Sequence, residues 1–319
     1  MISGLAVVDK PAGMTSHDVV GRCRRIFGQR RVGHAGTLDP DATGVLLVGL
    51  GQATRLLQYL TGLPKSYECR IVLGRATSTL DASGETTGEW DMTHVTLADA
   101  RGAAAALTGD IEQIPPMVSA IKIGGKRLHE LAREGIEVER PPRRVHIARF
   151  DVDLAEPPTP ANQLTRAMGE TGGPPPTATP EKQAPGALGP VFAAHVTCSS
   201  GTYVRSLAAD LGAALGGGAH LRDLVRTSVG PWDLSEAVPL DELEPTHVQP
   251  PAAAVRMLEP VTVPPERIDA IAHGRVLAQS ELGAAGGGPW AVLAPSGELL
   301  AVYANHGEGR AKPTVVLAG

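Results

Sequence analysis

A stretch rich in proline and glycine interrupts this chain of 319 residues. Between residues 156 and 190 the sequence has nine prolines and five glycines. Such a composition buries too little apolar surface to offset the conformational entropy that ordering it would cost. We therefore expect residues 156–190 to be a disordered surface insertion, so the folded core must come from the segments before and after it.

Short apolar runs with strand or helix periodicity occur on both sides of this insertion. A β-like run at Leu5–Val8 precedes a helix that Thr15-Ser16 can cap and that extends to about Phe27. Arg75–Gly88 is predicted to be a loop. Further strands are expected at Val45–Leu50, Lys65–Leu73, Phe192–Cys198, Trp290–Leu293, Leu299–Tyr303 and Pro313–Leu317, and further helices at Gln52–Leu60, Leu97–Leu107 and Tyr203–Leu215.

The charge distribution is uneven along the chain. The formal net charge of −5 and the pI near 6.1 argue against a protein that coats nucleic acid by bulk attraction. Nevertheless, Met1–Arg75 and Ala120–Arg144 both carry an excess of Lys and Arg over Asp and Glu. This asymmetry favours a side that faces a polyanion, although solvated helix faces would give the same excess.

The sequence predicts neither a membrane span nor a metal site. No apolar run reaches the roughly 18 residues that a span needs, and Met1–Pro11 carries Asp9 and Lys10 where a signal peptide would be apolar. We therefore expect a cytoplasmic protein. The three cysteines are widely separated and odd in number, which favours reduced structural thiols, and the histidines lack metal-ligand spacing.

One acidic residue in the glycine-rich segment Gly33–Gly44 is a candidate for catalysis. Asp39 stands before a proline, in a constrained turn, five residues after His34. The segment lacks the Gly-Lys-Ser/Thr of a phosphate loop, so no nucleotide cofactor is expected. A carboxylate fixed on a turn can serve as a nucleophile toward a sugar carbon or as a general base, given a nearby cation such as Arg205 or Lys10. Equally, an Asp-Pro pair can simply start a turn.

Four ordered blocks strengthen the catalytic interpretation. They are Val8-Asp9-Lys10-Pro11-x-Gly13-Met14-Thr15-Ser16, Gly33-His34-Ala35-Gly36-Thr37-Leu38-Asp39-Pro40-x-Ala42-Thr43-Gly44, Lys65-Ser66-Tyr67 and Cys198-Ser199-Ser200-Gly201-Thr202-Tyr203-Val204-Arg205. Together, and followed by Gly218-Ala219-His220-Leu221 and Leu224, they resemble the motifs of the bacterial tRNA pseudouridine-55 synthase family, the TruB type. The resemblance covers most of Ile2 to about Trp232, and the insertion at 156–190 departs from the family pattern.

The resemblance implies an isomerase that converts uridine 55 in the T-arm loop of tRNA to pseudouridine, without a cofactor or a metal. It implies Asp39 as the nucleophile, Tyr67 as the companion that stacks on the base, and Arg205 as the cation paired with Asp39. The base must be extruded from a folded loop, at an unstacking cost of a few kcal/mol. His34 is expected to fill the gap that the base leaves.

Further residues take expected roles through the same resemblance. The substrate-binding set is His34, Lys10, Tyr203 and Leu224. Ala120–Arg144 is similar to the family's mobile thumb loop, with Lys122, Lys126 and Arg127 contacting RNA phosphates and Gly124-Gly125 as a hinge. Asp81 is either part of an RNA-contacting loop or a turn residue. Ser16-His17-Asp18 is interpreted as a capped helix start, because adjacent residues cannot form a catalytic relay.

The chemistry of the expected reaction leaves one question open. The N1–C1′ bond of uridine must break, the base must turn, and C5 must join C1′. A single carboxylate suffices, either by attacking C1′ or by promoting elimination to a glycal. The sequence does not decide between the two routes.

The fold implied is α+β, with a mixed, largely antiparallel central sheet and flanking helices. Residues 1–245 are expected to form the pseudouridine synthase catalytic domain, and residues 256–319 a small C-terminal β-rich, PUA-like RNA-binding domain. The expected partner is tRNA, with no membrane and no obligate protein partner. Two alternatives remain: a guide-RNA-dependent pseudouridine synthase, and a non-catalytic tRNA-folding chaperone.

Overall fold

A computed structural model of the protein describes residues 1–119, 122–123, 126–127, 136, 138–155 and 187–317. The α-helices are α1 (Ser16–Ile26), α2 (Leu57–Thr61), α3 (Leu97–Ala106), α6 (Val204–Ala214), α7 (Pro265–Ala272) and α8 (Gln279–Leu282). Short 3₁₀ helices are η1 (Gly51–Leu56), η2 (Leu234–Glu236), η3 (Pro245–His247) and η4 (Pro251–Val255).

The strands fall into a large sheet, a smaller C-terminal sheet and two short hairpins. Those before the insertion are β1 (Gly4–Lys10), β2 (Val32–Ala35), β3 (Thr43–Leu50), β4 (Lys65–Leu73), β5 (Arg75–Thr77), β6 (Thr86–Glu89), β7 (Gly109–Gln113), β8 (Lys122–Ile123), β9 (Lys126–Arg127) and β10 (Arg143–Leu154). Those after it are β11 (Val191–Cys198), β12 (Ala219–Val229), β13 (Trp232–Asp233), β14 (Val238–Pro239), β15 (Glu259–Thr262), β16 (Leu277–Ala278), β17 (Trp290–Leu293), β18 (Leu299–Asn305) and β19 (Arg310–Val316).

The large sheet is mixed, with the order β14-β1-β3-β12-β4-β11-β10-β7, β2 on β3 and β13 on β12. Antiparallel neighbours include β1 with β3 and β10 with β11, whereas β1 with β14 and β12 with β3 are parallel. The expected α+β class with a mixed sheet is confirmed. By its contacts the chain divides into one compact unit of Met1–Lys65 with Val225–Gly319, and a second of Ser66–Leu224.

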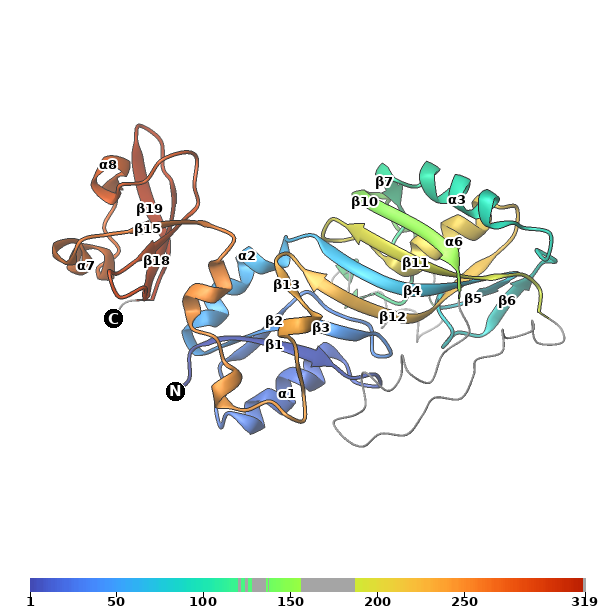
Figure 1. Cartoon of the computed structure of the whole chain (residues 1–319), viewed down its shortest axis with the longest axis horizontal. Coiled ribbons are helices and arrows are strands. Elements are labelled where there is room, and N and C mark those ends of the chain that lie inside the picture. The colour runs from blue at the N-terminus through green and yellow to red at the C-terminus, as the bar shows by residue number, and fades with distance from the viewer. Residues whose placement is uncertain (120–121, 124–125, 128–135, 137, 156–186, 318–319) are drawn as a thin grey trace, which may run out of the picture. The chain divides into compact units, whose positions relative to one another are not determined.

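In the first unit, β1 and β3 are buried on both faces. Along β1, Ala6 and Val8 join a cluster with Val19, Val20 and Cys23 of α1. The residues between these along β1, Leu5 and Val7, belong to a second cluster with Val45 and Leu47 of β3. This cluster includes Leu56 of η1 and Leu60 of α2. Successive side chains of a strand point to opposite faces, so this alternation places helical segments on both sides of the strands. Figure 1 shows α1 lying beside β1.

The C-terminal sheet belongs to the first unit as well. Its order is β15-β17-β18-β19-β16, and one face encloses its own core around Trp290 and Tyr303. Residues from its other face, among them Leu299 and Val315, join the cluster of Leu56 and Leu60. The expected β-rich C-terminal module is therefore present, and its strands share apolar packing with the N-terminal segment.

Among the described residues, the second unit contains the hairpins β5–β6 and β8–β9, the helices α3 and α6, and the sheet strands β4, β7, β10, β11 and the first part of β12. Helix α3 packs on β10 and on α6, and Figure 1 shows both helices on one side of these strands. A capping box at Thr96 and Asp99 begins α3, as a similar box at Thr15 and Asp18 begins α1.

Most predicted elements are confirmed, and three differ. The helix expected at Gln52–Leu60 is 3₁₀ in its first part, η1. There the Thr54 side-chain hydroxyl donates a hydrogen bond to Gly51 O at 2.8 Å. Arg75–Gly88 is not a simple loop, because it contains the hairpin strands β5 and β6. Residues 156–186 of the expected insertion lie outside the described residues. The last four residues of the insertion belong to the fold, since Leu73 N donates to Pro190 O at 3.1 Å.

Candidate active site

Asp39 lies in the turn that joins β2 to β3. Its carbonyl oxygen accepts a hydrogen bond from Ala42 N at 3.2 Å. Gly36 and Gly44 bound the turn with φ angles of +84° and +99°, which favour glycine. Leu38 and Ala42 are buried, whereas Asp39 is half-buried. The turn therefore anchors its apolar residues and leaves its acid partly exposed.

Lys10, at the end of β1, fixes the backbone that follows Asp39. Its Nζ donates hydrogen bonds to the carbonyl oxygens of Pro11, Met14 and Pro40 at 2.8, 2.6 and 2.8 Å. An ammonium group has three N–H donors, so these carbonyls use all of them. The side chain is fully buried, and burial lowers the pKa of Lys10 to about 8.

This arrangement predicts that activity and the contribution of Lys10 to stability change in opposite directions as the pH rises. Above about pH 8 the neutral amine of Lys10 keeps two donors for three carbonyls, so the Asp39 turn loses a contact and kcat should fall. The unfolded chain keeps Lys10 protonated up to its ordinary pKa near 10.5 and so binds more protons than the folded chain between these values. The contribution of Lys10 to the free energy of unfolding therefore rises with pH over that range.

The measurement is a pH–rate profile from pH 6.5 to 9.5, taken together with urea unfolding at each pH. A Lys10→Met variant has no amine to titrate at this position, so the activity that it retains should not fall near pH 8. A wild-type rate that stays level up to pH 9.5 would contradict the assignment.

Ser16 fixes the residue before Asp39. Leu38 N donates to Ser16 Oγ at 2.9 Å, and the Ser16 hydroxyl faces Leu38 O at 3.4 Å. On the other side, Gly13 N donates to Pro40 O at 3.0 Å. The sequence predicts a capped helix start at Ser16 but not this contact, because the bonded residues are 22 positions apart.

His34 lies on β2 and packs against a second histidine. The rings of His17 and His34 are 5.9 Å apart between centroids and meet edge to face at 80°. Burial, followed by the nearby His17 and Arg226, lowers the pKa of His34, so the neutral ring is favoured. Its Nδ1 is buried and accepts no hydrogen bond from the residues that the structure describes. A neutral flat ring suits a stacking role.

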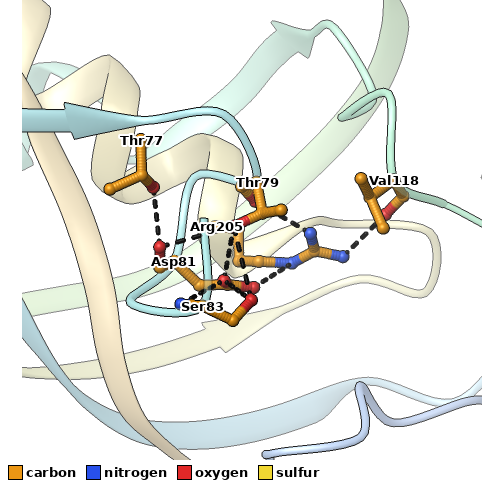
Figure 2. A network of polar contacts seen from close by, with 6 residues as sticks. All are labelled: Thr77, Thr79, Asp81, Ser83, Val118 and Arg205. Atoms are coloured by element: carbon orange, nitrogen blue, oxygen red, sulfur yellow. Dashed lines mark hydrogen bonds and ion pairs between the residues drawn. The ribbon is translucent and has the colours of Figure 1, made fainter. Parts of the chain in front are cut away.

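Arg205, in the first turn of α6, is a buried cation of the second unit. Its Nη1 donates to Thr79 O and its Nη2 to Val118 O, each at 2.9 Å. Its Nε lies 3.6 Å from Asp81 Oδ2 (Figure 2). Only 4% of the Arg205 side chain is exposed, against 25% for Asp81. Asp81 is thus the acid that faces Arg205 within this unit.

Asp81 is held in a network of its own loop. Its Oδ1 accepts hydrogen bonds from Thr79 Oγ1 and from both N and Oγ of Ser83, at 2.6 to 3.0 Å. Thr77 Oγ1 donates to Asp81 O at 2.6 Å (Figure 2). Between Thr79 and Asp81, Leu80 has a φ of +62°, which is uncommon outside glycine. Asp81 therefore lies in a turn, whereas its expected RNA contact stays a prediction, and its ion pair with Arg205 is an addition that the sequence did not indicate.

The remaining sequence-predicted residues described in this unit are Tyr203, Tyr67 and Leu224. The Gln113 side chain binds both backbone groups of Tyr203. Its Oε1 accepts a hydrogen bond from Tyr203 N at 2.7 Å, and its Nε2 donates one to Tyr203 O at 3.0 Å. Tyr67 is buried in β4, 9% exposed. Leu224 is half-buried in β12 and follows Asp223, whose φ is +52°.

The sequence-predicted site residues fall into two sets, one in each unit. Lys10, His34 and Asp39 share the first unit, where Lys10 directly holds the turn that carries Asp39. The second unit contains Tyr67, Tyr203, Arg205 and Leu224. A pairing of Arg205 with Asp39 stays a prediction.

The expected thumb loop is described only in part. Lys122 pairs with Arg127 and Ile123 with Lys126 across the hairpin of β8 and β9. The side chains of these residues, and the expected hinge Gly124-Gly125, lie outside what the structure describes.

The described residues also bear on three further expectations: metal binding, membrane spanning and the state of the cysteines. No three His, Cys, Asp or Glu side chains gather there as a metal site would require. Within the same ranges, no helix combines the length and the apolar character needed to cross a bilayer. Cys23, Cys69 and Cys198 are buried and form no disulfide, as expected. Burial raises the pKa of the Cys23 and Cys69 thiols to about 11 and about 12, which makes both unreactive.

Comparison with known proteins gives two matches to family models. Residues 24–169 match the N-terminal domain of the TruB family of pseudouridylate synthases. Residues 205–267 match the C-terminal domain of tRNA pseudouridylate synthase B. The first match contains the blocks at 33–44 and 65–67, whereas the block at 8–16 lies before it and the second match begins at Arg205, the last residue of the fourth block.

Similar full-length proteins carry the same name. A tRNA pseudouridine synthase B of Mycobacterium sp. (strain KMS) is 46% identical over 318 residues, covering 98% of this chain and 96% of the relative. Another, from Thermobifida fusca (strain YX), is 44% identical and covers all of both chains.

Solved structures resemble the fold. A chain of an H/ACA RNP bound to a substrate RNA has a TM-score of 0.67 at 23% identity, covering 98% of this chain and 84% of that one. A chain of a Cbf5-Nop10-Gar1 complex has a TM-score of 0.67 at 25% identity, covering 99% and 84%.

Proposed function

The chain belongs to the TruB family of pseudouridylate synthases, and on that basis we propose that it converts uridine 55 in the T-arm loop of tRNA to pseudouridine. Its full-length relatives are named for a tRNA pseudouridine synthase activity. The choice of position 55 rests on the resemblance of the motif around Asp39.

The observation that carries this proposal is the rigid turn around Asp39. Its neighbours Leu38 and Pro40 are bonded to Ser16, Gly13 and Lys10, none of which uses the Asp39 carboxylate for these contacts. A turn that merely connected two strands would not need a buried ammonium beneath it. A nucleophile gains from such a scaffold, since holding the reacting group in place removes much of the entropic cost of the reaction.

The reaction that we assign to Asp39 is an isomerisation. The N1–C1′ bond breaks, the uracil turns within the site, C5 bonds to C1′, and the proton lost from C5 is balanced by one gained at N1. The Asp39 carboxylate either attacks C1′ to form an ester or promotes elimination to a glycal. No redox equivalent or phosphate is consumed in either route.

The other site residues act on the substrate or on Asp39. Tyr67 stacks on the turned base, and Arg205 keeps the Asp39 carboxylate ionised. Tyr203 and Leu224 line the uracil pocket. His34 replaces the extruded base, a role that its neutral ring and its support from His17 favour.

The proposal extends to the partners and the organisation of the chain. Lys122, Lys126 and Arg127 of the thumb loop contact RNA phosphates. Residues 1–245 form the catalytic domain and residues 256–319 the RNA-binding domain. The enzyme acts in the cytoplasm and without an obligate protein partner. Relatives at 44–46% identity with a tRNA enzyme's name favour this over the guide-RNA-dependent alternative, since the H/ACA structures are more distant in sequence.

The deciding experiment uses the purified full chain and an unmodified T-arm stem-loop. We expect pseudouridine at position 55 by carbodiimide labelling, in EDTA and with no guide RNA. A stem-loop with cytidine at position 55 is the matched control and should yield none. Binding of the stem-loop without product would support the chaperone alternative, and product only with an added guide would support the guided one.

A further inference from the structure

Arg226 is a buried cation that the proposed reaction does not use. It lies on β12, and none of its side chain is exposed. Its Nε donates to Val45 O at 2.8 Å, its Nη1 to Thr37 O at 3.3 Å and its Nη2 to Gly36 O at 3.1 Å. Burying a charged group is costly unless it is hydrogen-bonded, so these contacts are strongly constrained.

The three carbonyls lie on either side of Asp39. Gly36 and Thr37 precede it at the exit of β2, and Val45 follows it in β3. A guanidinium group is planar and presents its donors in a fixed fork. One side chain therefore sets the distance between the two ends of the turn, while Ser16 and Lys10 hold its middle.

The backbone around Arg226 is adapted to this contact. Strand β12 pairs in parallel with β3, with Arg226 opposite Gly44. A Cβ atom at position 44 would lie 2.3 Å from the carbonyl oxygen of Arg226, closer than any side chain allows. Only glycine at this position lets β12 approach far enough for its arginine to reach the turn.

Arg226 acts on the His34 side of the turn as well. Gly36, whose carbonyl it binds, follows His34 by two residues on the same segment. Its positive charge contributes, after burial and His17, to holding the pKa of His34 below the usual range. The same charge opposes protonation of Lys10, whose pKa burial lowers first.

We infer that Arg226 is a positioning residue that fixes the spacing between His34 and Asp39 by bonding the backbone on both sides of the Asp39 turn. It need not touch the RNA to do so. The inference rests on the proposed function, because it assumes that Asp39 reacts with a uridine and that His34 fills the gap which that base leaves.

The test compares two variants and a control in the full chain. Arg226→Met removes the fork and the charge, and Arg226→Lys keeps the charge. Arg101→Met is the matched control, because Arg101 also donates to a backbone carbonyl, Val152 O at 3.0 Å, but in α3. Single-turnover rates at saturating T-arm stem-loop and the dissociation constant for the stem-loop are measured for each.

We expect Arg226→Met to lower the single-turnover rate about 100-fold, the effect of roughly 1 Å of misplacement, with a dissociation constant within about threefold of wild type. Arg226→Lys should recover about a tenth of the wild-type rate, because a single ammonium replaces only part of the fork. Arg101→Met should match the wild type. If Arg226→Met does not fold, the test uses Arg226→Lys alone. Its single-turnover rate should be lowered while its dissociation constant for the stem-loop stays near that of the wild type.

The opposing outcomes are distinct. Wild-type rates in Arg226→Lys and Arg226→Met overturn the inference and leave the proposed function intact. Equal losses of rate and RNA affinity in the folded variants also overturn it, since they indicate general damage to the fold. A wild-type chain that yields no pseudouridine refutes the proposed function itself.

Discussion

An Asp39→Asn variant is expected to form no measurable pseudouridine, with a rate at least about 10⁴-fold below wild type, because an amide can neither form the ester at C1′ nor assist elimination. Asparagine has nearly the same shape as aspartate. The contacts of Ser16, Gly13 and Lys10 to the neighbouring backbone do not involve the Asp39 side chain, so the turn should keep its conformation. Binding of the T-arm stem-loop should therefore stay within about threefold of wild type.

The control is Asp41→Asn, which removes the other acid of the same turn. Asp41 is exposed and affects Lys10 only through its charge, which raises the pKa of Lys10, so at pH 6.5, where Lys10 is protonated, its loss should change the rate less than about twofold. Both variants are measured by single-turnover labelling and by filter binding. A product rate in Asp39→Asn equal to that of Asp41→Asn would exclude Asp39 as the nucleophile.

Local sequence patterns predicted the elements around the site well. The apolar runs of β1 and β3 and the capped start of α1 depend on neighbouring residues, and each was identifiable from the sequence. Strands β5 and β6 were missed because Arg75–Gly88 is rich in threonine, serine and glycine, which are typical of loops. These strands exist through pairing with each other, which a local pattern does not reveal.

The carboxylate that we propose as the nucleophile could be singled out from the sequence, but the groups that hold its turn could not. Asp39 stands out as an acid in a glycine-rich turn, whereas Ser16 and Arg226 reach that turn from 22 and about 190 positions away. Both bind backbone atoms, and a backbone carbonyl has no identity in the sequence. A polar residue within a buried strand, such as Arg226 in β12, is the signal that could have indicated such a contact.

The second large effect is expected at Arg205, whose replacement by glutamine should lower both activity and stability. The product rate should fall about 10²–10³-fold, because the cation that we propose for Asp39 is lost. The free energy of unfolding should fall by about 3 kcal/mol, since the change removes the ion-pair partner of Asp81 and the guanidinium donors of the Thr79 and Val118 carbonyls. Urea unfolding and single-turnover labelling measure the two effects.

The matched control, Arg75→Gln, tests whether burial or distance decides the stability effect. Arg75 Nη2 lies 2.9 Å from Glu89 Oε1, closer than the 3.6 Å of the Arg205–Asp81 pair, but both side chains are about half exposed. Exposed pairs contribute less than about 1 kcal/mol, because water screens both charges. We therefore expect the shorter ion pair to matter less. A loss in Arg75→Gln as large as that in Arg205→Gln would mean that the Arg205 network gains nothing from its burial.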